Sequence, residues 1–172
     1  MSDPVPKDLQ AYDRSLARKR MGAGVLFFDP GGQVLLVDPV YKDTWEIPGG
    51  TVNADEAPGQ AAVREVQEEL GLTLPLGPLL AVDWVPPSPQ YSADRLMSEG
   101  VMMVFDGGIL TADQVAAITL QCEELRSYAF VPPDRLHEFL NDRLTRRVRA
   151  CLRARDTGSA LYLEDGNDPR PA

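Results

Sequence analysis

The sequence predicts an α+β fold, an α/β/α sandwich built around a mixed β-sheet. Stretches rich in β-branched and aromatic residues are interspersed with helical stretches without the strict alternation that a doubly wound parallel sheet requires. The 172 residues include 15 prolines and 14 glycines, which predicts many short elements joined by well-defined turns. The length suits one domain, residues 1–172, with residues 1–19 and 156–172 at its periphery.

The chain opens with a polar segment of irregular or weakly helical character, followed by a predicted β-hairpin. Two apolar runs, residues 22–29 and 33–38, flank a Pro-Gly-Gly turn. Apolar runs separated by such a turn are typical of antiparallel strands. Residues 44–52 predict a further short strand that breaks at Pro48.

A helix is predicted for residues 57–71, with further strands and helices after it. Pro58 suits the first helical turn and Gly71 suits the position after the last turn. The remaining elements are a strand at 78–85, a loop at 86–100, a strand at 101–108, a short helix or turn at 113–120, a strand at 127–132, one broken or two short helices at 133–155, and a tail that is mostly loop. The arginine-rich run 143–155 is either a solvated helix face, which we expect, or an anion-binding strip.

The composition disfavours several classes of protein. A formal net charge of −9 argues against a nucleic-acid-binding surface, which is normally basic. No apolar run reaches the roughly 18 residues of a membrane span, and the N-terminus has no apolar signal core. Cys122 and Cys151 lack CxxC spacing, so we expect free thiols and a soluble, cytoplasmic protein. The single histidine, His137, suits an ordinary surface helix, so a metal here should be a hard cation bound by oxygens.

The predicted helix 57–71 carries three carboxylates within about one turn, opposite an apolar stripe. They are Glu65, Glu68 and Glu69, at positions i, i+3 and i+4. Like charges at this spacing repel on an isolated helix. The face is therefore either solvated or a site for a cation. Two glycines just ahead of the helix favour the second interpretation, because glycine permits close approach of a ligand.

The spacing from Gly50 to Leu72 resembles the Nudix box, GX5EX7REUXEEXGU with U aliphatic. The matching residues are Gly50, Glu56, Arg64, Glu65, Val66, Glu68, Glu69, Gly71 and Leu72, which fill every fixed position. The hairpin before the box and the late strand and helix also follow the family's order. The resemblance to Nudix hydrolases thus covers about residues 20–150, and implies an α/β/α sandwich that hydrolyses a diphosphate linked to another moiety.

The resemblance also implies roles for individual residues. Glu65, Glu68 and Glu69 would bind Mg²⁺ (Mn²⁺ is an alternative), with the Gly49 carbonyl as a further ligand. Such ions neutralise the diphosphate and activate water. Arg64 and Glu56 would form a structural pair that supports the loop at Gly50. The general base would be Glu65 in the box, or Glu124 or Glu123 in a late loop.

The substrate is less constrained, because elements outside the box determine it. Residues 83–96 partly resemble the proline-rich stretch of ADP-ribose hydrolases, which favours ADP-ribose or another nucleotide sugar. A (deoxy)nucleoside triphosphate remains an alternative, as does a nucleotide-sensing regulator without turnover. Trp84 and Tyr91 are either stacking residues for a base or sugar, or residues of the core and its rim. The expected partner is a small molecule, and a homodimer is compatible with the resemblance but not required by it.

Overall fold

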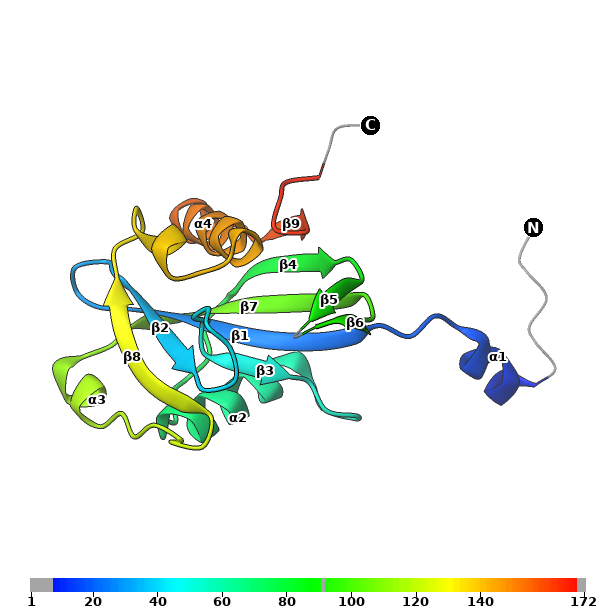
Figure 1. Cartoon of the computed structure of the whole chain (residues 1–172), viewed down its shortest axis with the longest axis horizontal. Helices are drawn as coiled ribbons and strands as arrows, with labels where there is room; N and C mark the ends of the chain where they lie inside the picture. The colour runs from blue at the N-terminus through cyan, green and yellow to red at the C-terminus, as the bar shows by residue number, and fades with distance from the viewer. Residues whose placement is uncertain (1–7, 91, 170–172) are drawn as a thin grey trace.

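A mixed β-sheet runs through the centre of the molecule, whose computed structural model describes residues 8–90 and 92–169 (Figure 1). Its strands are β1 (Arg20–Phe28), β2 (Val34–Pro39), β3 (Gly49–Thr51), β4 (Leu79–Val85), β7 (Gly100–Ile109), β8 (Leu125–Val131) and β9 (Leu161–Glu164). They lie in the order β8-β2-β1-β7-β4-β9, and β3 pairs with β1. The pairs β1–β7 and β4–β9 are parallel, whereas the other strand pairs of this sheet within the described residues are antiparallel.

Helices cover both faces of this sheet. Helices α2 (Pro58–Leu70) and α3 (Ala112–Ala116) lie against one face, and α4 (Asp142–Thr157) lies against the other, after the 3₁₀ turn η1 (Leu136–Glu138) (Figure 1). On β1, Val25 and Phe27 belong to the apolar cluster of α2, whereas Leu26 and Phe28 belong to that of α4. Both faces of the strand are buried, which explains its continuous apolar sequence. The predicted α+β sandwich is confirmed.

The helix that contains the Nudix-like residues has the bounds that its sequence predicts. Pro58 occupies the first turn of α2. Gly71 follows the last turn in the left-handed conformation, with φ of 69°, and its N–H donates to the Gln67 carbonyl at 2.9 Å. A residue with a side chain would be strained at this φ, so the glycine allows the helix to end here.

The predicted hairpin is confirmed, the prediction of a loop at 86–100 is wrong, and the tail contains a short strand that was not predicted. Residues 86–100, expected as a loop, contain the antiparallel strands β5 (Ser88–Gln90) and β6 (Ser92–Met97). The tail, expected to be mostly loop, contributes β9, which pairs in parallel with β4. Its pairing partner is far away in sequence, so local sequence patterns give little sign of it.

The N-terminal segment is helical only in part. Helix α1 (Leu9–Ser15) begins after Asp8, whose side chain accepts a hydrogen bond from the Ala11 N–H, and it has no buried residue. It lies apart from the sheet in Figure 1. Over the described residues, no helix combines the length and apolar character needed to cross a membrane.

A buried ion pair attaches α4 to the sheet, contrary to the prediction of a solvated arginine face. Arg147 is 7% exposed, and its Nε donates to Asp83 Oδ2 at 2.7 Å. Asp83 on β4 is fully buried, and its Oδ1 accepts a hydrogen bond from the Gly166 N–H at 3.0 Å. Arg143 also forms an ion pair, with Asp165. The prediction failed because part of this face packs against β4 and the turn after β9.

We expect Asp83→Asn to lower the free energy of unfolding by about 3 kcal/mol, because it leaves the buried Arg147 guanidinium without its counter-charge. The control is Asp168→Asn, which removes a carboxylate from the exposed Arg153–Asp168 pair and should cost less than about 1 kcal/mol. Urea unfolding of the two variants measures the difference. Equal midpoints would contradict a stabilising role for the buried pair.

Candidate functional site

A buried carboxylate lies where the N-terminal end of β3 meets the last turns of α2. Glu69 is only 7% exposed, and its Oε2 accepts a hydrogen bond from the Gly49 N–H at 2.8 Å. Glu65, one turn earlier on the same helix, is partly buried, whereas Glu68 is exposed. The three carboxylates therefore have different environments, although the sequence places them on one helix face.

Two glycines allow the backbone of β3 to come close to these carboxylates. Gly49 has φ of 143°, and a Cβ at this position would lie 2.3 Å from the Ala23 carbonyl oxygen on β1. A Cβ at Gly50 would lie 2.5 Å from the Glu65 carboxylate. Neither position tolerates a side chain without local rearrangement. The glycines thus create the close contact between β3 and the acidic residues of α2.

Arg64 binds three carboxylates and the backbone of β3. Its Nε and Nη2 donate to the two oxygens of Glu56 at 2.8 and 2.9 Å, a bidentate pair. Nη1 donates to Glu65 Oε1 and Glu68 Oε2, both at 2.9 Å, and Nη2 also reaches the Thr51 carbonyl at 3.0 Å. Arg64 therefore fixes the loop before α2 against the helix.

The surroundings shift the pKa values of these carboxyl groups in opposite directions. The Arg64 hydrogen bonds lower the pKa of Glu56 to about 2. Burial raises the pKa of Glu69 to about 8, and the charges of Glu65, Glu46 and Glu124 add to this rise, whereas the Gly49 N–H opposes it. Burial also raises the pKa of Glu65. Thus hydrogen-bond partners stabilise the charged form of Glu56, whereas the charged form of Glu69 lacks such stabilisation.

The other predicted site residues differ in how close they lie to the carboxylates of α2. Glu124 is close enough to Glu65 and Glu69 for its charge to raise the pKa of each, although its own side chain is exposed. Glu123 is also exposed. Trp84 donates from Nε1 to Glu99 Oε2 at 2.9 Å. Tyr91 lies outside the described residues.

The carboxylate oxygens around Glu69 suit a hard cation, although they are not already arranged around one. Within residues 8–90 and 92–169, no three acidic, histidine or cysteine side chains converge closely enough to bind an ion as they stand. Arg64 Nη1 occupies one oxygen of Glu65 and one of Glu68, which leaves the second oxygen of each. Carboxylate oxygens and the small cradle at Gly50 fit Mg²⁺ or Mn²⁺.

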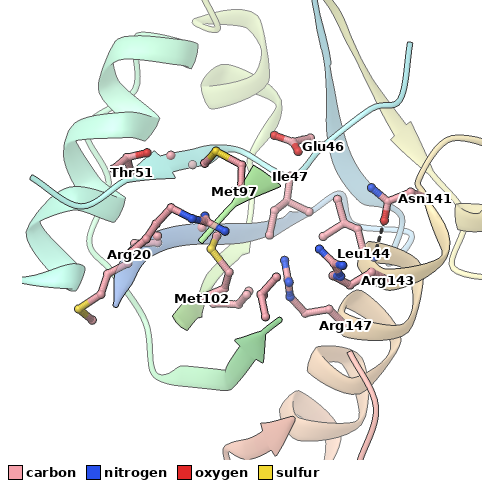
Figure 2. A pocket seen from close by; sticks show the side chains of 18 of the residues that line it. Arg20, Glu46, Ile47, Thr51, Met97, Met102, Asn141, Arg143, Leu144 and Arg147 are labelled. Atoms are coloured by element: carbon pink, nitrogen blue, oxygen red, sulfur yellow. Dashed lines mark hydrogen bonds between the residues drawn. The ribbon is translucent and has the colours of Figure 1, made fainter. Parts of the chain in front are cut away.

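A pocket of about 270 Å³ adjoins β3 (Figure 2). Gly49, Gly50 and Thr51 line it, so it shares the β3 backbone with the acidic residues. Four cationic side chains also line it: Arg20, Lys42, Arg143 and Arg147. The sequence had not indicated the first two, whereas the last two belong to the run 143–155, for which an anion-binding strip was the alternative to a solvated face. The i,i+4 spacing of the last two, which places them on one helix face, was the available signal.

The chain spans less than half of the length of the proteins to which it is related in sequence. Diphosphoinositol polyphosphate phosphohydrolase 2 of Mus musculus is 41% identical over 78 residues, 45% of this chain and 44% of the relative. Diphosphoinositol polyphosphate phosphohydrolase 3-alpha of Homo sapiens is 41% identical over 78 residues, 45% of this chain and 48% of the relative.

Solved structures share the fold at low sequence identity. The UDP-X diphosphatase structure has a TM-score of 0.66 and 18% identity, and covers 92% of this chain and 76% of its own. The MutT protein of Methanosarcina mazei Go1 has a TM-score of 0.63 and 23% identity, and covers 84% of this chain and 99% of its own. An ADP-ribose pyrophosphatase of Streptococcus suis has a TM-score of 0.59 and 19% identity, and covers 86% and 99%.

The family assignment rests on a match to most of the chain. The NUDIX domain model matches residues 18–153, which include β1, β3, α2 and most of α4. The resemblance found in the sequence is therefore confirmed: this chain belongs to the NUDIX family of hydrolases.

Proposed function

We propose that this chain hydrolyses a phosphoric anhydride bond in a small-molecule diphosphate, with Mg²⁺ or Mn²⁺ as cofactor. The observation that carries the proposal is the buried Glu69 carboxylate, which has one neutral hydrogen-bond donor and three carboxylates acting on it. An acid held in this way is stabilised when a cation joins it. A diphosphate is polyanionic, and its hydrolysis requires the same cation.

Glu65, Glu68 and Glu69 would bind the cation, together with the Gly49 carbonyl. When bound, the cation would neutralise the diphosphate and lower the pKa of the attacking water. Arg64 and Glu56 serve as structural support in this proposal, because Arg64 holds one oxygen each of Glu65 and Glu68 and binds Glu56 bidentately. Rigid support of this kind keeps ligand groups in place for chemistry.

Glu65 is the proposed general base. Arg64 Nη1 takes one lone pair of its Oε1 at 2.9 Å, so three lone pairs of the carboxylate remain, enough for the cation and for a proton from water. The water oxygen then bonds to one phosphorus while the bond from that phosphorus to the bridging oxygen breaks. Both products end in a phosphate group. Partial burial raises the pKa of Glu65, which makes it a stronger base than an exposed glutamate.

Two classes of substrate have support. A nucleoside diphosphate sugar such as ADP-ribose is favoured by the proline-rich stretch after α2, and structures of a UDP-X diphosphatase and an ADP-ribose pyrophosphatase share the fold. The sequence relatives named diphosphoinositol polyphosphate phosphohydrolases favour a phosphorylated inositol diphosphate instead. A (deoxy)nucleoside triphosphate is an alternative that rests on the sequence alone. A sensor without turnover is disfavoured because all acids of the box are present.

The decisive experiment is a panel of diphosphates incubated with the purified chain and Mg²⁺ or Mn²⁺. The panel contains nucleotide sugars, nucleoside triphosphates and a diphosphoinositol polyphosphate, and mass spectrometry identifies the products. Hydrolysis in ¹⁸O-labelled water shows which phosphorus receives the solvent oxygen. Nucleotide binding without hydrolysis of any compound would instead support a sensor.

We expect Glu69→Gln to lower the cation-dependent turnover at least about 100-fold while the fold is retained, because the amide lacks the charge that binds a cation. The control is Glu138→Gln, which removes an exposed carboxylate paired with Arg135. Circular dichroism verifies the fold of each variant. A Glu69→Gln variant with turnover near that of the parent would refute the assignment of Glu69 as a ligand.

The affinity for Mn²⁺ should rise as the pH increases towards about 8, because burial raises the pKa of Glu69 to about 8 in the metal-free protein. Below this pH, the cation must displace a proton, which costs up to about tenfold in affinity per pH unit. Above the pKa the dependence should level off. Calorimetry in two buffers of different ionisation enthalpy measures the released proton, and Glu69→Gln should abolish this release.

Glu124 and Glu123 are neighbours in the same loop, so they form a matched pair for testing the base. Because the Glu124 charge acts on Glu65 and Glu69, we expect Glu124→Gln to reduce turnover about tenfold. Glu123→Gln should change it less than about twofold. Removal of a general base typically costs at least about 100-fold. A loss of that size in Glu124→Gln would therefore transfer the role of base from Glu65 to Glu124.

A further inference from the structure

Cationic side chains gather in the lining of the pocket beside β3, in a protein that is acidic overall. Among the described residues, its lining contains three arginines and a lysine but one carboxylate, that of Glu46, although the chain has a formal net charge of −9. In Figure 2, Arg20 approaches the pocket from the side of β1, whereas Arg143 and Arg147 approach it from α4. Side chains from elements far apart in sequence thus direct positive charge into one space.

The cations of the pocket are only partly neutralised by neighbouring acids. Arg147 uses Nε to bind Asp83, Arg143 uses Nε to bind Asp165, and the Lys42 ammonium pairs with Glu46. Each guanidinium carries five N–H donors, so several remain for another acceptor. Arg20 donates from Nε to the Ser98 carbonyl at 3.3 Å, and forms no ion pair with the acids whose side chains are described. Arg20 is therefore the cation most available to a ligand.

The pocket offers little to a nucleobase. Among its described lining residues one is aromatic, Tyr41, and the Lys42 ammonium lies 5.5 Å from the centre of that ring. Trp84, the aromatic residue that the sequence had indicated for stacking, is not among the lining residues and donates its N–H to Glu99. A base would therefore bind among guanidinium groups rather than between aromatic rings.

We infer that this pocket binds the non-reacting part of the substrate, and that this part is a compact group carrying several phosphates rather than a nucleoside. The inference rests on the proposed function, since it assigns the substrate class of the same site. Gly49 and Gly50 line the pocket and also contact the acidic residues. A diphosphate at β3 therefore has the cation site on one side and arginines for further phosphates on the other. Guanidinium groups bind phosphate oxygens in a bidentate way, which makes arginine the fitting side chain.

The test compares the binding of two ligands to the full chain in a metal chelator, without turnover. The probes are inositol hexakisphosphate, a compact polyphosphorylated ring, and ADP-ribose, a nucleotide sugar. Calorimetry should give an affinity for inositol hexakisphosphate at least about tenfold higher than for ADP-ribose. This affinity should also fall about tenfold or more between low and moderate salt, because the attraction between charges is screened. Tighter binding of ADP-ribose would overturn the inference.

Variants of Arg20 locate the binding in the pocket. Arg20→Gln should weaken the binding of inositol hexakisphosphate about tenfold, and Arg20→Lys should recover much of the loss because it restores the charge. The control, Arg153→Gln, also removes one positive charge, but from an exposed side chain of α4 that does not line the pocket. An equal effect of Arg20→Gln and Arg153→Gln would mean that net charge alone drives binding, which overturns the inference.

The same measurements separate the failure of this inference from failure of the proposed function. If the chain hydrolyses nucleotide sugars with Mn²⁺ but binds inositol hexakisphosphate weakly, the proposed function stands and the inference fails. If it binds inositol hexakisphosphate through Arg20 but hydrolyses no diphosphate, the assignment of the pocket stands and the proposed hydrolysis fails.

Discussion

The arrangement of the candidate site depends on the burial of the Glu69 carboxylate against the backbone of β3. A buried carboxylate is costly unless donors or cations compensate it. The Gly49 N–H is a single neutral donor, and it does not offset burial and the neighbouring carboxylates, so the pKa of Glu69 rises to about 8. This contact requires that β3 lie close to both α2 and β1, which explains why residue 49 has no side chain.

The carboxylate of Glu56, just before α2, has the opposite environment, which lowers its pKa. Arg64 binds both oxygens of Glu56, and the pKa of Glu56 falls to about 2. Groups whose pKa values are pushed apart by their environment commonly have different roles. The full compensation of Glu56 suits a structural residue. The ionised form of Glu69 lacks such compensation, which suits a residue that binds a cation, and this contrast supports the proposed division of roles.

The sequence predicted the acidic part of the site better than the basic part. Helical spacing placed the three glutamates of α2, and Pro58 and Gly71 marked the ends of this helix, because these are local properties of the chain. The pocket could not be predicted in this way, since Arg20 begins β1 whereas Arg143 and Arg147 lie on α4. Only the assembled sheet and its packing against α4 bring them together. The strand β9 was missed for the same reason, because a distant strand stabilises it.

The two halves of the site have opposite charge, and this difference has a consequence for the proposed reaction. A polyanionic substrate is repelled by the carboxylates of α2 unless a cation is present, whereas the arginines beside β3 attract it with or without one. Binding energy from the pocket can thus position a diphosphate that the acidic residues alone would exclude. This requires the two halves to be close, and β3 keeps them close because a Cβ at Gly50 would lie 2.5 Å from the Glu65 carboxylate. A larger residue there would push Glu65 away from the shared wall, and would separate the charges that the reaction needs together.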